Sequence, residues 1–276
     1  MTDRRSTPAN ARVAHVSLRG LSAAPRLVEG EAGAVVAPLA DLLAEPGGAR
    51  ERQLLRGDPV LVLDRHAGFA FLRSEKDGYC GYVEERLLGP AIRPTHRVAV
   101  PATHLYPAPD LRRREIARLS FGARLVVTGE AGRFARTDDG LFVPACHLEP
   151  AGRPEQDPAA VAELFRGTPY LWGGNSRDGL DCSGLVQAAL LACGIACPGD
   201  SDQQARMVGE PLAGLSDLRR GDLVFWKGHV AMALSPDRII HANAHSMSVA
   251  CEALNDAVAR IAATEGPVIA LRRPRP

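Results

Sequence analysis

The spacing of apolar and polar positions divides the chain into parts of different character. From residue 33 to residue 150, short apolar runs alternate with glycine, proline and aspartate, a pattern typical of small all-β units. Within this zone residues 54–63 align with residues 119–127. In both places a glycine, an Asp-Gly turn, an aromatic-Val pair and a leucine follow in the same order. We therefore predict two copies of one unit of about 50 to 60 residues.

The last part of the chain changes to a mixed pattern. After a linker rich in Pro and Gly at residues 151–158, apolar positions recur at helical spacing in residues 158–166 and 182–193. Four β-runs follow, at residues 222–226, 230–234, 238–242 and 268–272. Helices followed by strands of antiparallel character indicate an α+β domain. The polar, Arg-rich residues 1–32 predict either a mobile arm or a wrap around the first domain.

Composition and charge narrow the class of protein. The chain has 276 residues with 46% hydrophobic and 24% charged residues, which excludes disordered and collagen-like proteins. Its 33 Lys+Arg and 32 Asp+Glu leave a net charge of +1, so we expect no general binding to nucleic acid or to anionic membranes. No apolar run approaches the roughly 18 residues of a membrane span, and the N-terminus shows no secretory signal. We therefore expect a cytoplasmic protein whose six cysteines are thiols.

One of these cysteines has the setting of a nucleophile. Cys182 stands in the sequence Asp181-Cys182-Ser183-Gly184, at the start of the second predicted helix. The unpaired amides and the dipole of a helix N-terminus stabilise a thiolate and lower the pKa of the thiol. An isolated cysteine is more often a buried packing residue, so Cys182 needs partners before it indicates an enzyme.

Two histidines supply these partners. His229 begins one predicted strand and His241 ends the next, and a short turn at residues 235–237 joins them. Adjacent antiparallel strands can hold the two imidazoles within hydrogen-bonding reach. We expect His229 to accept the proton of Cys182, and His241 to fix the tautomer of His229 and to stabilise its imidazolium.

Four stretches of the last domain resemble the NlpC-type cell-wall peptidases, a papain-like family of cysteine peptidases. They are residues 169–174 (PYLWGG), 181–186 (DCSGLV), 220–230 (RGDLVFWKGHV) and 240–242 (IHA). The resemblance implies that Cys182 is the nucleophile, His229 the general base and His241 the third member of the triad. It also suggests the Tyr170 hydroxyl and the backbone amide of Cys182 as oxyanion donors, although Tyr170 is equally compatible with a core aromatic residue.

The repeated units are similar to bacterial SH3-like domains, and this combination implies a substrate. Family members cleave murein stem peptides, most often between γ-D-glutamate and the diamino acid. Those with tandem SH3-like domains resemble recycling enzymes that need a free N-terminal L-Ala. A buried carboxylate selects such an ammonium group best, and Asp200 is the first candidate and Asp181 the second. Ser183 and Ser201 are candidates for binding the carboxylate of the substrate.

In such enzymes a Glu and a Tyr of the first SH3-like domain close one end of the cleft. The resemblance points to Tyr79 or Tyr82 for the tyrosine, with Tyr79 preferred, and Asp58 stands where the Glu is often found. A surface-turn aspartate is the competing interpretation of Asp58, and its side chain is shorter. A helix cap is the competing interpretation of the segment that begins at Asp200.

The sequence thus predicts an α+β protein: an arm at residues 1–32, SH3-like β-barrels at 33–92 and 93–150, and a papain-like catalytic domain at 151–276. We expect a cysteine endopeptidase that uses no metal or other cofactor and acts on murein-derived peptides of the L-Ala-γ-D-Glu-diaminopimelate type. The alternatives are an acyltransferase with the same thiolate, a zinc site on the Cys and His residues, and a murein-binding module that has lost catalysis. The diamino acid and the oligomeric state stay open.

Overall fold

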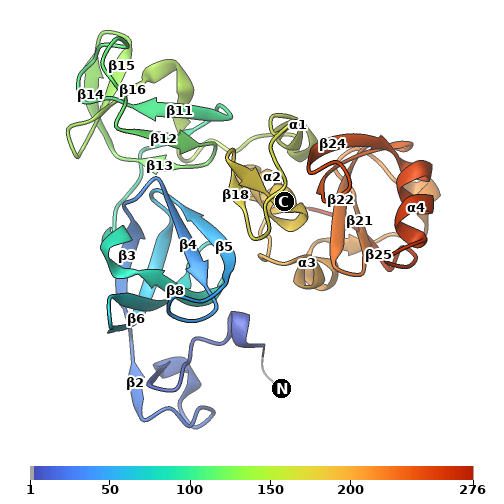
Figure 1. Ribbon diagram of the computed structural model, residues 1–276, viewed down its shortest axis with the longest axis horizontal. Coiled ribbons are helices and arrows are strands. Elements are labelled where there is room, and N and C mark those ends of the chain that lie inside the picture. The colour runs from blue at the N-terminus through green and yellow to red at the C-terminus, as the bar shows by residue number, and fades with distance from the viewer. Residues whose placement is uncertain (1–2, 276) are drawn as a thin grey trace. The chain divides into compact units, whose positions relative to one another are not determined.

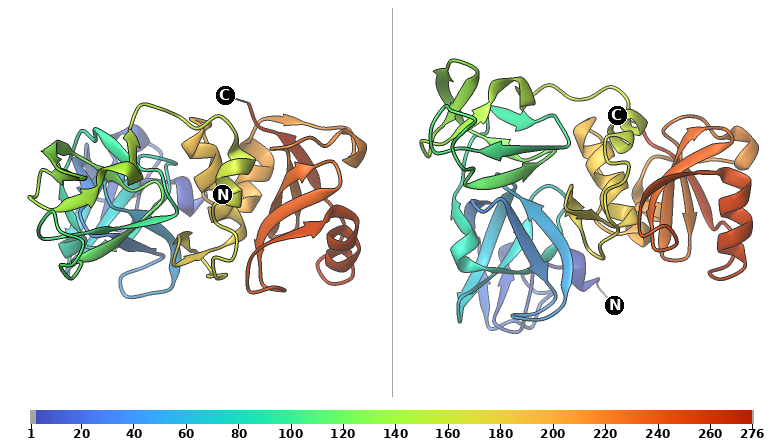
Figure 2. Two further views of the ribbon diagram at one scale, coloured as in Figure 1. Left: turned by 90° about the horizontal axis from the view of Figure 1, so that it is seen from above. Right: turned by 45° about the horizontal axis from the view of Figure 1, so that its top comes forward.

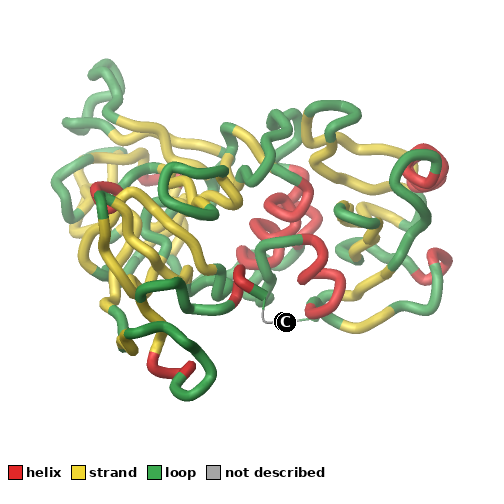
Figure 3. Tube along the Cα trace, turned by 60° about the horizontal axis from the view of Figure 1, so that its bottom comes forward, coloured by secondary structure: helices red, strands yellow, loops and turns green. Residues whose placement is uncertain are grey.

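The computed structural model describes residues 3–275, and the chain forms two compact units that meet between Gly152 and Arg153. The first unit consists of strands, loops and short 3-10 turns, and the α-helices all lie in the second (Figure 3). None of the helices between residues 3 and 275 is long and apolar enough to cross a membrane.

The first unit begins with a seven-stranded antiparallel sheet in the order β5-β4-β8-β7-β6-β3-β9 (Figure 1). Its core is built from apolar side chains that alternate along the strands, including Leu42, Leu54, Leu72 and Val83. The strands are β3 (Glu31–Val35), β4 (Leu39–Leu43), β5 (Arg50–Leu55), β6 (Pro59–His66), β7 (Phe69–Ser74), β8 (Cys80–Glu84) and β9 (Leu88–Pro90), with a 3-10 turn η3 at Glu85–Leu87.

A second, smaller set of sheets follows in the same unit and has a separate core around Leu105, Leu119 and Val143. It contains the sheets β13-β10-β17, β11-β12 and β14-β15-β16. The elements are β10 (His96–Val98), β11 (Ala102–Leu105), β12 (Ala117–Ser120), β13 (Arg124–Leu125), β14 (Val127–Ala131), β15 (Phe134–Thr137), β16 (Phe142–Pro144), η4 (Ala145–His147) and β17 (Leu148–Pro150).

The two copies of the sequence repeat share a backbone feature. Gly57 and Gly122, which align in the repeat, have φ of 79° and 84°, a left-handed conformation that favours glycine. At Gly57 a Cβ atom would also come within 2.4 Å of the carbonyl oxygen of Arg124. The repeat therefore preserves the turn between two strands as well as the apolar pattern.

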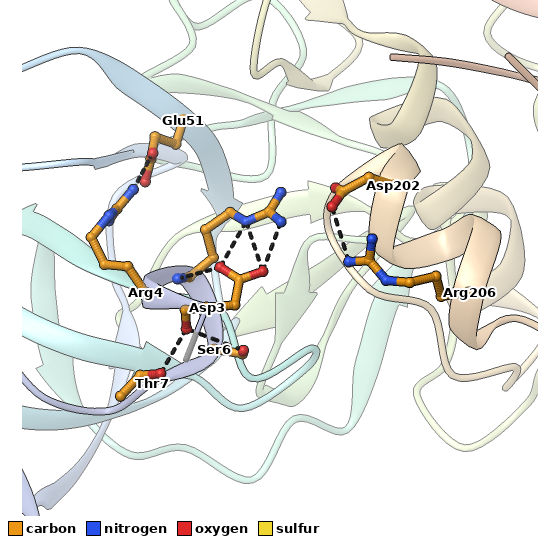
Figure 4. Close-up of polar contacts among 8 residues, drawn as sticks. Asp3, Arg4, Ser6, Thr7, Glu51, Asp202 and Arg206 are labelled. Atoms are coloured by element: carbon orange, nitrogen blue, oxygen red, sulfur yellow. Dashed lines mark hydrogen bonds and ion pairs between the residues drawn. The ribbon is translucent and has the colours of Figure 1, made fainter. Parts of the chain in front are cut away.

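The N-terminal segment wraps the first barrel, one of the two alternatives that the sequence left open. Val13 is buried against Leu63 and Phe71. Arg12 donates a hydrogen bond to Asp64 at 2.8 Å, and Figure 4 shows Arg4 paired with Glu51. The elements of this segment are η1 (Arg4–Ser6), β1 (Val13–His15), η2 (Val16–Leu18) and β2 (Arg26–Val28).

The second unit is a six-stranded sheet in the order β20-β25-β21-β22-β23-β24. Figures 1 and 2 show this sheet between α2 on one side and α4 on the other. The elements are α1 (Pro158–Glu163), β18 (Asn175–Ser176), β19 (Gly179–Leu180), α2 (Cys182–Ala192), α3 (Ser201–Met207), β20 (Glu210–Pro211), η5 (Leu215–Asp217), β21 (Leu223–Trp226), β22 (His229–Ser235), β23 (Arg238–Asn243), β24 (Ser248–Ala253), α4 (Leu254–Ala262) and β25 (Ala270–Arg273).

The predicted α+β class is confirmed, and both predicted helices and all four predicted strands of this unit are present. Helix α1 ends at Glu163, three residues before its predicted end. Helices α3 and α4 and strand β24 were not predicted. Helix α3 buries the polar side chains of Gln203 and Gln204, so it has no apolar stripe to reveal it. Helix α4 does carry a stripe, Leu254, Ala257 and Ile261, which the sequence interpretation overlooked.

Candidate active site

The N-terminus of α2 is held by one carboxylate. Asp181 is the N-cap residue, and its side chain accepts hydrogen bonds from the backbone N–H of Gly184 at 2.6 Å and of Gly173 at 2.9 Å. The Ser183 hydroxyl donates a third bond to the same carboxylate at 3.0 Å. Cys182 is therefore the first residue of a capped helix, at the helix start as predicted, and the residue is 7% exposed.

Gly184 allows the loop before the helix, which contains Gly174, to lie close against the first turn of α2. A Cβ atom on Gly184 would lie 2.3 Å from the carbonyl oxygen of Gly174. That same oxygen accepts the backbone N–H of Asp181 at 3.2 Å. The glycine two positions after Cys182 is thus required by packing, independently of any chemistry.

The two histidines form a direct hydrogen-bonded pair. His229 is the first residue of β22, and His241 lies on the neighbouring antiparallel strand β23. Alternation along the strands places both imidazoles on one face of the sheet, and Nε2 of His229 lies 2.9 Å from Nδ1 of His241. The structure therefore brings together the two histidines that the sequence singled out.

The histidine pair continues into two residues that the sequence analysis missed. Nε2 of His241 lies 3.1 Å from Oε2 of Glu252 on β24, and Arg260 of α4 donates to both oxygens of that carboxylate. A single acidic residue in a strand is usually a solvent-facing side chain, so the sequence held no signal that would have identified Glu252.

Cys182 lies beside the strand that begins with His229. Its Sγ is 4.0 Å from the carbonyl oxygen of Gly228, the residue that precedes His229. Nε2 of His229 is engaged with His241, so Nδ1 is the ring nitrogen that does not take part in the histidine pair. Tyr170 is half-buried nearby, and burial, together with the charges of Cys182 and Asp181, raises the pKa of its hydroxyl. Tyr170 therefore keeps its proton at neutral pH and can donate a hydrogen bond.

Burial keeps both imidazoles neutral. Burial, with a smaller contribution from the neighbouring His241, lowers the pKa of His229 to about 3. Burial also lowers the pKa of His241 to about 4, although the carboxylate of Glu252 works in the opposite direction. A neutral His229 has an unprotonated nitrogen at physiological pH, which a general base requires.

The predicted substrate residues of the second unit gather at the starts of α2 and α3. Asp200 occupies the N-cap position of α3, but its side chain makes no capping hydrogen bond, in contrast to the competing cap interpretation. The neighbouring Asp202 pairs instead with Arg206 at 3.0 Å (Figure 4). Gln204 of α3 donates to the backbone carbonyl of Ser183 at 3.0 Å and so ties α3 to the start of α2. Ser201 is the first residue of α3 and is partly exposed.

The predicted residues of the first unit serve the first barrel in this structure. Tyr79 is buried in its core, and Tyr82 stacks at a tilt on Phe71. Asp58 is 3% exposed and accepts hydrogen bonds from the backbone N–H of Leu55 at 2.9 Å and from Lys76 at 2.6 Å. The side chain of Asp58 therefore stabilises the turn between β5 and β6.

The six cysteines, all within the described range, form no disulfide. Burial raises the pKa of the Cys80 thiol to about 12, so this cysteine is an inert core residue. Among residues 3–275, no group of three or more His, Cys, Asp or Glu side chains has the arrangement of a metal site.

Comparisons with known proteins find similarity in two stretches of the chain. Residues 167–264 match the model of the NlpC/P60 family, and residues 42–88 match the bacterial dipeptidyl-peptidase SH3 domain. The γ-D-glutamyl-L-lysine dipeptidyl-peptidase of Bacillus cereus is 28% identical over 240 residues, which cover 74% of this chain and 71% of the relative. The Bacillus subtilis protein of the same name is 27% identical over 75% of this chain and 77% of its own length.

The fold is shared with a solved structure. The crystal structure of an NlpC/P60 family protein from Bacillus cereus superposes with a TM-score of 0.75 at 22% identity, over 89% of this chain and 100% of that one. The resemblance predicted from the sequence, SH3-like and NlpC-type, is thus confirmed.

Proposed function

We propose that this chain, which carries an NlpC/P60 domain behind a bacterial dipeptidyl-peptidase SH3 domain, is a cysteine endopeptidase of murein stem peptides. The bond cleaved joins γ-D-glutamate to the L-diamino acid in peptides with a free N-terminal L-Ala. The observation that carries the proposal is the Cys182 thiol at a capped helix N-terminus beside the hydrogen-bonded pair of His229 and His241. The name shared by two relatives that align over about three quarters of the chain supports the substrate class.

The reaction starts with proton transfer from Cys182 to Nδ1 of His229. The sulfur then attacks the γ-carbonyl carbon of D-glutamate, and the oxyanion accepts hydrogen bonds from the Tyr170 hydroxyl and the amide of Cys182. Donors of this kind are typically worth a few kcal/mol of transition-state stabilisation. The C–N bond breaks as the His229 imidazolium gives its proton to the leaving amine. Water, deprotonated by His229, finally hydrolyses the thioester and regenerates the thiol.

The selection of the peptide rests on charge. We assign the ammonium group of L-Ala to the carboxylate of Asp200, which lies at the start of α3. Ser183 and Ser201 are the proposed donors to the α-carboxylate of D-glutamate. Asp181 is the second candidate for the ammonium group, although its oxygens already accept three hydrogen bonds. Tyr79 and Asp58 stay predictions as residues that close the cleft.

Two further points concern the identity of the diamino acid in the substrate and the cellular location of the protein. Relatives are named for lysine, and a diaminopimelate peptide is the other substrate to test. A cytoplasmic location, suited to the recycling of murein peptides, stays a prediction.

The test uses purified full-length protein with L-Ala-γ-D-Glu-L-Lys and L-Ala-γ-D-Glu-diaminopimelate, and mass spectrometry of the products. We expect release of L-Ala-γ-D-Glu that stops on treatment with iodoacetamide or in the variant Cys182→Ala, and that continues with a chelator. A wild-type protein that releases no dipeptide from either tripeptide contradicts the proposal. Release that only a chelator stops would instead indicate a metallopeptidase.

A further inference from the structure

Glu252 and Arg260 extend the line of catalytic side chains, although no part of the proposed reaction touches them. Cys182, His229, His241 and Glu252 come from α2, β22, β23 and β24 in turn, and Arg260 comes from α4. We propose that Glu252, held by Arg260, is a positioning residue that sets which nitrogen of His229 is free to accept the thiol proton. This inference rests on the proposed function for its kinetic test only.

Register explains how Glu252 reaches the histidine. In the β23–β24 ladder His241 pairs with Ala250, and Glu252 pairs with Ile239. His241 and Glu252 are therefore diagonal neighbours on one face of the sheet, within reach of a long side chain. Ile239 on this face packs against α4, and α4 also supplies Arg260. The helix thus brings a cation to the carboxylate that meets the histidine.

The carboxylate of Glu252 is ionised at neutral pH. Partial burial opposes ionisation, but the hydrogen bonds and charge of Arg260, with a smaller contribution from His241, outweigh it and lower the pKa of Glu252. Arg260 donates through Nε to Oε1 at 3.1 Å and through Nη2 to Oε2 at 2.6 Å. This two-point contact fixes the plane of the carboxylate and leaves Oε2 facing His241.

The ionised carboxylate of Glu252 determines which atom donates and which accepts in each hydrogen bond between Glu252 and His229. An ionised carboxylate can only accept, so Nε2 of the neutral His241 must carry the proton, and Nδ1 of His241 must be the acceptor. The bond of 2.9 Å requires Nε2 of His229 to donate and therefore to be protonated. Nδ1 of His229 is then unprotonated, and this is the nitrogen that accepts the proton of Cys182. One carboxylate thereby selects the tautomers of two buried histidines.

The decisive variant reverses the polarity and keeps the ion pair. In Glu252→Lys combined with Arg260→Glu, opposite charges still face each other, but His241 meets a donor in place of an acceptor. Nε2 of His241 must then be the acceptor, and the same chain of bonds puts a proton on Nδ1 of His229. We expect kcat for the tripeptide to fall at least about tenfold, since a reversed tautomer disables a general base. KM should change little, because the substrate-binding residues are untouched.

The tautomers themselves provide a readout that a purely structural ion pair would not change. Two-bond 1H–15N NMR spectra of the imidazoles distinguish the protonated from the unprotonated nitrogen. We expect Nε2–H for both histidines in the wild-type protein and Nδ1–H in the double variant. The matched control is Glu163→Gln, which breaks the exposed pair of Glu163 with Arg220 on the same unit and should leave both kcat and the tautomers unchanged.

The outcomes separate cleanly. A loss of at least about tenfold in kcat together with Nδ1 protonation supports the proposal, and a smaller loss, or retention of the Nε2 proton, overturns it. If the double variant does not fold, Glu252→Gln replaces it. Its amide can donate or accept, so a second tautomer of His241 should appear, and a single Nε2–H tautomer overturns the proposal. A wild-type protein that cleaves neither tripeptide refutes the proposed function, while the NMR spectra still decide the role of Glu252.

Discussion

Replacement of Gly184 by alanine tests whether close packing at the start of α2 places the nucleophile. The new Cβ atom would lie 2.3 Å from the carbonyl oxygen of Gly174, whereas real Cβ atoms essentially never come within 3.0 Å of a neighbour. The contact partner is backbone, so the loop and the helix must separate by 3.0 − 2.3 = 0.7 Å or more. Overpacking of this kind typically costs about 1–3 kcal/mol of folding free energy.

The substitution should lower catalysis as well as stability. Gly174 accepts the backbone N–H of Asp181, so the displaced loop carries the N-cap of α2 and with it Cys182. A misplacement of about 1 Å at a reacting atom can lower a rate by roughly 100-fold. We therefore expect Gly184→Ala to lower kcat for the tripeptide by about 10- to 100-fold while the domain stays folded at 25 °C.

The assay compares kcat and the thermal unfolding midpoint of Gly184→Ala with those of the wild type. The matched control is Gly214→Ala in the same unit, where the nearest atom is the Ser216 hydroxyl oxygen at 3.7 Å and the backbone is extended. The control should keep wild-type values for both. Wild-type kcat in Gly184→Ala would refute the argument that this contact positions Cys182.

Three further predictions concern the titratable groups. His229 and His241 have lowered pKa values in the folded state, so the unfolded chain binds more protons below pH 6.5. The free energy of unfolding should therefore decrease as the pH is lowered from 6.5 towards the folded-state pKa values, by up to about 1.4 kcal/mol per pH unit for each histidine. Urea titrations that show no such decrease would contradict the burial of the two histidines as neutral groups. Tyr170→Phe should lower kcat by about 10- to 1,000-fold with KM little changed, and an unchanged kcat would return Tyr170 to the role of a core aromatic residue. Asp200→Asn should raise KM for the free-amine tripeptide and abolish its preference over the N-acetylated one, whereas equal turnover of both peptides by the wild type excludes ammonium recognition.

The sequence predicted those parts of the site whose signals are local. The residues after Cys182 have apolar positions at helical spacing, which predicted a helix with Cys182 in its first turn. His229 and His241 lie on two strands joined by a short turn, so adjacency along the chain predicts their contact. Antiparallel pairing puts the two imidazoles on one face of the sheet, where they form the hydrogen bond.

The parts that could not be predicted depend on pairing between elements that the sequence did not reveal. Glu252 lies on β24, a strand that was not predicted, and contacts His241 diagonally on the adjacent strand β23. Its partner Arg260 is eight residues further along, in a helix that was not predicted either. Asp58 has a partner that the sequence did not reveal either. The family resemblance suggested it as a residue that closes the cleft, which stays a prediction, and Lys76, 18 positions later, donates a hydrogen bond to its carboxylate. In both cases the neighbours in space are not specified by periodicity.

The surroundings of Cys182 also change the argument about its activation. The sequence suggested that the positive end of α2 stabilises a thiolate. In the structure, however, the Asp181 carboxylate occupies the amide of Gly184 in that first turn and places a negative charge one residue from the thiol. A nearby like charge disfavours the thiolate, so the dipole and the cap act in opposite directions. Burial lowers the pKa of His229 to about 3 and keeps this imidazole neutral. In the proposed mechanism the nucleophile is therefore created by the proton transfer to Nδ1 of His229. On this reasoning the tautomer of His229, and hence Glu252, matters more to catalysis than the helix dipole does.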